Sequence, residues 1–186
     1  MCAKVMKRKV CLVGESGVGK TSLIRRFVEG LYDDAYIATL GAVVKKKTVH
    51  LPRPDGPVQV DLVVMDIMGR RTFMQLFREA YFAGAAGVLA VFDLTDRRTL
   101  RALPAWIGGV RQTVGDIPVV VIGNKADLDE RITVSSSNVV DVLGPIALDS
   151  MQTSAKTGNN VETAFLRLAS LVEAASRRAP TSGVGS

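Results

Sequence analysis

Residues 14–22, "GESGVGKTS", bring together the residue types that can hold a phosphate group. A glycine, four residues, a second glycine, a lysine and a hydroxyl residue have the spacing of a phosphate-binding loop. Glycines let consecutive backbone N–H groups point at one anion, and the N-terminus of a following helix adds the positive end of its dipole. In this pattern Lys20 contacts the β- and γ-phosphates, and the Thr21 hydroxyl coordinates Mg²⁺.

The alternative is a glycine-rich turn that binds nothing. The complete pattern, placed between a strand-like run and a helix-like run, disfavours that alternative. The residues predicted to line the phosphates are Glu15, Ser16, Gly17, Val18, Gly19, Lys20, Thr21 and Ser22.

A second candidate for metal binding is Asp66, at the end of the apolar run "VQVDLVVMD". An acidic residue there commonly holds the same metal in phosphate-loop proteins, directly or through one of its ligands. Gly69 follows three residues later, and without a side chain its N–H can approach a γ-phosphate closely. The ordinary alternative for Asp66 is a turn residue at a strand end.

A phosphate loop alone does not distinguish kinases, ATPases and GTPases. The segment "GNKAD" at residues 123–127 helps to distinguish these three classes of protein. It follows the apolar run "PVVVI", so it stands at the carboxyl end of a strand, where open α/β sheets bind their ligands. Here the sequence resembles the Ras superfamily of small GTPases, most closely its Rab-like and Ras-like branches. The resemblance extends over about residues 7–176.

In that family an Asn-Lys-x-Asp segment reads guanine, and the matching residues are Asn124, Lys125 and Asp127. The Asp carboxylate can accept hydrogen bonds from the ring N–H and the exocyclic amine of guanine. Adenine offers no such pair of donors. An unpaired buried acceptor costs about 1 to 3 kcal/mol, and more when it is charged, so the wrong base is rejected.

Other residues take their expected roles from the resemblance alone. "TSAKTG" contains Ser154, Ala155 and Lys156, which match the family's last guanine contact. By position, Tyr32 resembles the aromatic residue that packs on the base. Thr39 resembles the threonine that reaches Mg²⁺ only when a γ-phosphate is present.

The chain departs from the family after Gly69, where Arg70 and Arg71 replace the usual Gln and Glu. The glutamine orients the attacking water. Arginine has five N–H donors and no acceptor, so it can stabilise charge on the γ-phosphate but cannot accept a proton from water. We expect slow intrinsic hydrolysis. A correctly placed arginine could instead accelerate the reaction, and both arginines could simply form a solvated basic patch that meets an acidic partner.

Lys20, Thr39, Gly69 and Arg70 are therefore the candidate catalytic residues. Thr21, Thr39 and Asp66 are the candidate metal ligands. The implied activity is slow hydrolysis of GTP to GDP and phosphate, with Mg²⁺ as the cofactor. Two alternatives stay open: a scaffold that holds nucleotide without useful turnover, and a phosphate-loop kinase or ATPase.

The elements that must position these residues alternate between short apolar runs and helical stretches, which is typical of an α/β fold with a mostly parallel sheet. The resemblance implies a three-layer domain with a six-stranded sheet, one antiparallel strand and helices on both faces. The reversed strand follows from the short turn "PRPDGP". Predicted strands cover 9–14, 42–51, 58–66, 87–93, 118–124 and 147–154. Predicted helices begin after Lys20 and cover about 72–82, 99–114, 136–143 and 160–177.

Composition fits one soluble globular domain: 186 residues, 47% hydrophobic and 23% charged. We expect a short extension over residues 1–6, a G domain over 7–177 and a disordered tail over 178–186. The longest apolar run, residues 82–92, is shorter than the roughly 18 residues of a spanning helix. The charged start without an apolar core predicts a cytoplasmic protein. Cys2 and Cys11 form neither a disulfide framework nor a metal site.

The net charge of +6 comes from scattered basic clusters without interleaved aromatic residues, so we expect no nucleic-acid partner. No cysteine follows Cys11, so the sequence predicts no prenyl anchor and at most peripheral contact with membranes. The resemblance implies effectors, exchange factors and activating proteins that meet two mobile segments, at about 32–43 and 66–82. We expect a monomer.

Overall fold

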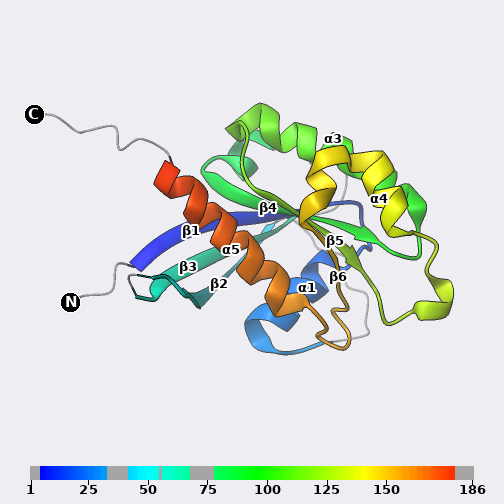
Figure 1. The fold of residues 1–186 in the computed structure, drawn as a ribbon, viewed down its shortest axis with the longest axis horizontal. Helices are drawn as coiled ribbons and strands as arrows, with labels where there is room; N and C mark the ends of the chain where they lie inside the picture. Colours follow the sequence, from blue (N-terminus) through cyan, green and yellow to red (C-terminus); the bar gives the residue numbers. More distant parts are fainter. Residues whose placement is uncertain (1–4, 33–41, 55, 68–77, 179–186) are drawn as a thin grey trace, which may run out of the picture.

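The computed structural model describes residues 5–32, 42–54, 56–67 and 78–178. It contains a six-stranded sheet in the order β2-β3-β1-β4-β5-β6 (Figure 1). The strands are β1 (Val5–Val13), β2 (Ala42–Leu51), β3 (Val58–Ile67), β4 (Ala85–Asp93), β5 (Val119–Asn124) and β6 (Ser150–Gln152). Strands β2 and β3 pair antiparallel, and the other four pairs are parallel. The predicted sheet, with one reversed strand, is confirmed.

Helices cover both faces of this sheet, as predicted (Figure 1). Residues 78–82 are helical, and the longer helices are α1 (Lys20–Glu29), α3 (Arg97–Val114), α4 (Ser136–Leu143) and α5 (Val161–Arg178). Side chains of α1 and α5 share one hydrophobic core with the sheet, whereas those of α3 and α4 share the other. The result is a three-layer α/β fold.

The central strands feed both cores because successive side chains point to opposite faces. On β1, Val10 and Leu12 join the core beneath α1 and α5. Cys11 and Val13 join the core beneath α3 and α4. All four are fully buried. A strand buried on both faces reads as a continuous apolar run, which explains the pattern "VCLV".

Capping side chains mark the N-termini of α3 and α4. Asp96 precedes α3, and its side chain accepts a hydrogen bond from the Arg98 N–H at 2.9 Å. Ser135 begins a capping box with Asn138 before α4. These caps satisfy N–H groups that have no partner within the helix. Helix α4 begins and ends at the predicted residues, and α3 begins two residues before the predicted start.

The predicted last strand is wrong in its first half. Residues Gly144–Asp149 form a 3-10 helix, and only Ser150–Gln152 form β6. Pro145 has no N–H to donate to a strand ladder, and its fixed φ suits the start of a helical turn. The buried side chain of Ala147 packs into the core beneath α3 and α4. At the other end of the chain, β1 begins at Val5, before the predicted start.

Candidate phosphate- and guanine-binding site

The phosphate-loop residues connect the end of β1 to the start of α1 at the carboxyl edge of the sheet. Two of its glycines are required by close approach. A Cβ on Gly14 would lie 2.1 Å from the Val91 carbonyl oxygen, and one on Gly19 would lie 2.2 Å from Asn124 Nδ2. Gly19 also has φ of +98°, which side chains other than glycine rarely adopt. The loop therefore packs directly on the ends of β4 and β5.

Lys20 lies inside this loop, with 6% of its surface exposed. Its ammonium donates hydrogen bonds to the carbonyl oxygens of Gly14 and Glu15, each at 2.8 Å. Burial lowers the pKa of Lys20 to about 8, although the carboxylates of Asp66 and Glu15 act in the opposite direction. The Lys20 ammonium thus lies against the backbone of the phosphate loop, at the position where the sequence pattern expects a phosphate-binding lysine.

Thr21 and Asp66 lie in direct contact, although 45 positions separate them in the chain. The Thr21 hydroxyl donates to Asp66 Oδ2, and Asp66 is 1% exposed. The Tyr81 hydroxyl donates to the Asp66 carbonyl oxygen at 2.6 Å, which fixes the end of β3. A hydroxyl and a carboxylate are hard oxygen ligands, so this pair fits Mg²⁺.

Thr21 and Asp66 do not form part of a larger cluster of metal ligands among the described residues. Among the described residues, no group of three or more His, Cys, Asp or Glu side chains could hold a metal ion. Magnesium commonly binds through one or two protein groups together with phosphate oxygens and water. The pair formed by Thr21 and Asp66 matches that mode rather than a closed protein cage.

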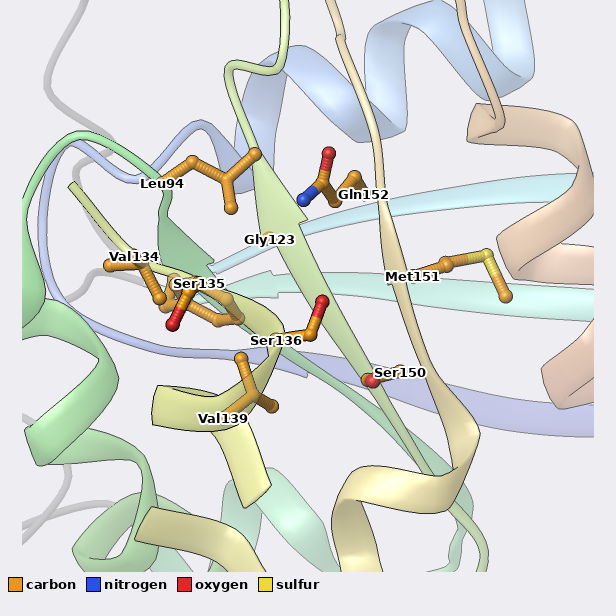
Figure 2. Close-up of a pocket in the computed structure, with 10 residues that line it drawn as sticks. Leu94, Gly123, Val134, Ser135, Ser136, Val139, Ser150, Met151 and Gln152 are labelled. Atoms are coloured by element: carbon orange, nitrogen blue, oxygen red, sulfur yellow. The ribbon is translucent and has the colours of Figure 1, made fainter. Parts of the chain in front are cut away.

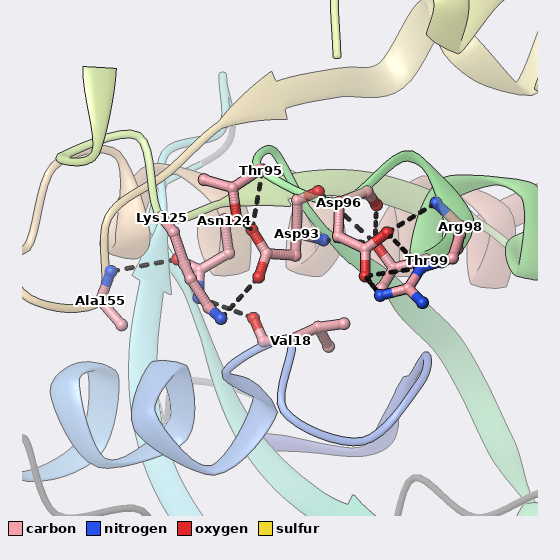
Figure 3. A network of polar contacts seen from close by, with 9 residues as sticks. All are labelled: Val18, Asp93, Thr95, Asp96, Arg98, Thr99, Asn124, Lys125 and Ala155. Carbon is pink, nitrogen blue, oxygen red and sulfur yellow. Dashed lines mark hydrogen bonds and ion pairs between the residues drawn. The ribbon is translucent and has the colours of Figure 1, made fainter. Parts of the chain in front are cut away.

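Asn124 joins the phosphate loop to the segment after β6 (Figure 3). It is 2% exposed, and its amide nitrogen donates to the Val18 carbonyl oxygen at 2.9 Å. Its amide oxygen accepts from the Ala155 N–H at 3.1 Å and from the Thr153 hydroxyl at 3.2 Å. One buried side chain therefore connects two of the predicted binding segments.

The remaining predicted guanine contacts lie beside Asn124. The Ser154 hydroxyl donates to Asp127 Oδ1 at 2.6 Å, so the carboxylate is held by a side chain from the neighbouring loop. Lys125 has φ of 70°. Ala155 is buried, whereas Lys156 is exposed. The structure thus places the loop after β5 beside the loop after β6, whereas the sequence showed only their order along the chain.

Asp93, at the end of β4, is a functional candidate that the sequence analysis missed. Its Oδ2 lies 2.5 Å from the Lys125 ammonium (Figure 3). Its Oδ1 accepts from the Thr95 N–H at 2.8 Å and from the Thr95 hydroxyl at 2.7 Å. The sequence does show an acidic residue at the end of the apolar run "GVLAVFD", which could have marked Asp93 as a candidate. In the structure Asp93 lies opposite Asn124 in the pairing of β4 and β5.

Trp106 is a second candidate that the sequence analysis missed. It lies on α3, and its indole N–H donates to Glu15 Oε1 in the phosphate loop at 3.1 Å. The ring is buried in the core beneath α3 and α4. No local sequence pattern predicts this contact, because 91 positions separate the two residues.

Several predicted site residues add less. Ser16 and Gly17 are exposed at the tip of the phosphate loop, and Ser22 is half-buried in the first turn of α1. Tyr32 is half-buried and packs at the margin of the core beneath α1 and α5. Thr39, Gly69, Arg70 and Arg71 lie outside the described residues, as do most of the two segments predicted to be mobile.

A cavity of about 220 Å³ lies between β5, β6 and the start of α4 (Figure 2). Its walls include Phe92, Leu94, Val139 and Gln152, and none of the predicted nucleotide contacts lines it. Gly123, which also lines it, directly precedes Asn124. The cavity is therefore separate from the predicted nucleotide site. No helix in the described part of the chain has the length and apolar character that crossing a membrane requires.

Comparisons with known proteins agree with this geometry. The Ras family model matches residues 9–174. Ras-related protein Rab-8B of Dictyostelium discoideum is 36% identical over 162 residues, which cover 87% of this chain and 77% of that protein. Ras-related protein Rab-8 of Diplobatis ommata is 34% identical over 162 residues, covering 87% and 75%. The chain belongs to the Ras family of small GTPases.

Proposed function

We propose that this GTPase is a molecular switch that binds GTP and GDP together with Mg²⁺ and hydrolyses GTP slowly. The observation that carries the proposal is the position of Asn124, whose amide contacts both Val18 in the phosphate loop and Ala155 in the guanine segment. A single ligand with a phosphate end and a base end would span these two segments.

The phosphate end is assigned to the loop around Lys20. Its backbone N–H groups and buried ammonium would bind the β- and γ-phosphates. Thr21 and Asp66 would hold Mg²⁺, with Thr39 as a further ligand in the GTP state. When bound, the metal neutralises charge on the phosphate oxygens. Gly69 would donate its N–H to the γ-phosphate.

The base end is assigned to Asp127, which Ser154 already holds by a hydrogen bond of 2.6 Å. Its carboxylate would accept from the two guanine donors, and Ala155, whose N–H donates to Asn124, would line the base end of the site. Lys125 and Tyr32 would pack against the base. The G domain is assigned to residues 7–177, and effectors and regulators would meet segments 32–43 and 66–82.

The test of base recognition is Asp127→Asn. Its amide would donate where guanine also donates, so we expect GDP affinity to fall by about 10- to 100-fold. Xanthosine diphosphate has an acceptor at that position, so its affinity should rise. Equal affinity of the wild-type protein for GDP and ADP would overturn the guanine assignment.

The slow-hydrolysis part of the proposal rests on Arg70, which lacks the acceptor that water positioning requires. Single-turnover hydrolysis should be faster in Arg70→Gln than in the wild-type protein. A marked decrease would show that Arg70 stabilises the transition state. GTP retained in freshly purified protein supports slow turnover, whereas phosphate release near the buffer baseline over many turnovers favours the nucleotide-holding scaffold.

A further inference from the structure

Arg26 on α1 contacts two parts of the candidate site and the end of its own helix. Its Nε donates to the Ala155 carbonyl oxygen at 2.9 Å, and one terminal nitrogen donates to the Lys156 carbonyl oxygen. The other terminal nitrogen donates to the Gly30 carbonyl oxygen at 3.0 Å, at the end of α1. The guanidinium carbon also lies 5.9 Å from the centroid of the Tyr32 ring.

This arrangement uses the planar geometry of arginine. A guanidinium presents five donors in a rigid fork and can also lie over an aromatic ring, whereas an ammonium is a compact point charge. Three of the donors bind carbonyl oxygens of separate residues. The side chain therefore fixes the guanine segment relative to α1 and to the aromatic ring.

The contact with Lys156 leads to the carboxylate that is proposed to read guanine. The Lys156 carbonyl and the Thr157 N–H belong to one planar peptide group, so orienting the first orients the second. The Thr157 N–H donates to Ser154 Oγ at 3.1 Å. Ser154 Oγ in turn donates to Asp127 Oδ1 at 2.6 Å. Four consecutive links join Arg26 to Asp127.

The contact with Ala155 acts on the same segment from its other side. The Ala155 N–H donates to Asn124 Oδ1, and its carbonyl oxygen accepts from Arg26. Both polar groups of this residue are thus satisfied by side chains from other elements. Its backbone cannot rotate without breaking one of these hydrogen bonds.

We infer that Arg26 is a positioning residue for guanine recognition, which sets the orientation of Asp127 through residues 154–157 and braces the Tyr32 ring. The inference rests on the proposed guanine site. Arg26 would act on the base only through other residues, so it is not a catalytic residue.

The test compares Arg26→Ala and Arg26→Lys with Arg25→Ala. Arg25 is a matched control because it is the adjacent arginine of α1 and forms an ion pair with Glu29 at 3.9 Å within the helix. The readout is the ratio of the dissociation constants for inosine diphosphate and GDP. Inosine lacks the exocyclic amine, so this ratio reports how well Asp127 is aimed.

We expect Arg26→Ala to weaken GDP binding about tenfold and to lower the ratio severalfold, because loss of orientation removes the advantage of the second guanine donor. Arg26→Lys should lower the ratio as well, since an ammonium cannot bind both carbonyl oxygens and lie over Tyr32. Arg25→Ala should leave the affinity and the ratio close to wild type.

A purely structural role gives a different result. If Arg26→Ala lowers the melting temperature and weakens both nucleotides equally, so that the ratio stays at its wild-type value, the inference is wrong. If that variant does not fold, an unchanged ratio in Arg26→Lys overturns it just as well. Failure of the guanine site itself appears separately, as wild-type protein that binds ADP as tightly as GDP.

Discussion

Buried polar side chains mark the site at the scale of single residues. Removing a charge or an amide from water is costly unless the group is paired, so such residues concentrate where they have a task. Most of those in the described chain lie at the carboxyl ends of the strands or just beyond them. They are Lys20, Asp66, Asp93, Asn124, Thr153 and Ser154.

Asp93→Asn is expected to loosen nucleotide binding through Lys125. The asparagine keeps Oδ1, which accepts from Thr95, but replaces Oδ2, which lies 2.5 Å from the ammonium, by a donor. The Lys125 side chain is 34% exposed, so screening limits the loss to about 1 kcal/mol, or about fivefold. Dissociation of a fluorescent GDP should accelerate accordingly.

Asp96→Asn is the control for that measurement. Asp96 caps α3 and pairs with the exposed Arg98, in the loop that follows Asp93. Asparagine caps helices about as well as aspartate, so this substitution should change the melting temperature little. The Asp96 carboxylate acts on Lys125 only as a weaker, distant charge, so GDP dissociation should accelerate less than in Asp93→Asn. Equal acceleration in both variants would show that the loop as a whole, rather than the contact with Lys125, controls dissociation.

Cys11 is expected to be chemically inert in the folded protein. It is fully buried, and burial raises the pKa of its thiol from 9.0 to about 12. The reactive thiolate is therefore scarce at pH 8, and the sulfur is also shielded from reagents. Peptide mass spectrometry should find Cys11 unmodified after iodoacetamide treatment of native protein and alkylated in guanidinium chloride. Alkylation at the same rate in both conditions would contradict the packing of β1.

At the scale of elements, local signals in the sequence predicted most of the fold. The apolar runs predicted the five longer strands, and the predicted helix over residues 136–143 coincides with α4. The short β6 was harder, because a three-residue edge strand carries almost no periodic pattern. The apolar residues before it form a 3-10 helix instead.

For the candidate site too, short local patterns predicted some residues, whereas residues that act through long-range contacts were missed. The phosphate loop and the "NKAD" segment were found because each is a short pattern at a strand end. Arg26, Asp93 and Trp106 were not found, because their roles depend on contacts between elements that are distant in the chain. A helical arginine and a buried tryptophan are ordinary in sequence, and only the packing shows what they hold.

Gly87→Ala tests the packing of α5 on β4. A Cβ at this position would lie 2.5 Å from Val172 Cγ2 and 2.9 Å from Leu168 Cδ1, both on α5. Overpacking of a core typically costs about 1 to 3 kcal/mol. The melting temperature should therefore fall by several degrees in a calorimetric scan.

Gly108→Ala provides the opposite expectation. Gly108 lies within α3, and no neighbouring atom is found within 4 Å of its added Cβ. Alanine is favoured over glycine in a helix by about 1 kcal/mol, so this variant should be slightly more stable. A gain of stability in Gly87→Ala as well would contradict the described packing of α5 on β4.

At the scale of the whole molecule, the lysine run of β2 shows how the net charge is distributed. Lys45 pairs with Glu29, and Lys46 pairs with Asp61, each at 2.8 Å or less. The Lys47 ammonium lies 4.2 Å from the centroid of the Phe27 ring. These lysines connect β2 to α1 and β3, so this basic run contributes to packing.

The candidate site likewise joins elements from the whole chain, and its ligand should therefore stabilise the whole fold. The phosphate loop, the end of β3 and the loops after β5 and β6 would all contact one nucleotide. A ligand that binds only the folded state at 100 times its Kd adds about 2.7 kcal/mol. For a domain of this size we expect GDP with Mg²⁺ to raise the melting temperature by about 5 to 10 °C. ADP at the same concentration should give little shift in melting temperature. EDTA should reduce the shift caused by GDP, because Thr21 and Asp66 would lose the metal that links them to the phosphates. Equal shifts with GDP and ADP would mean that the loops after β5 and β6 take no part in binding, and that the phosphate loop alone holds the ligand.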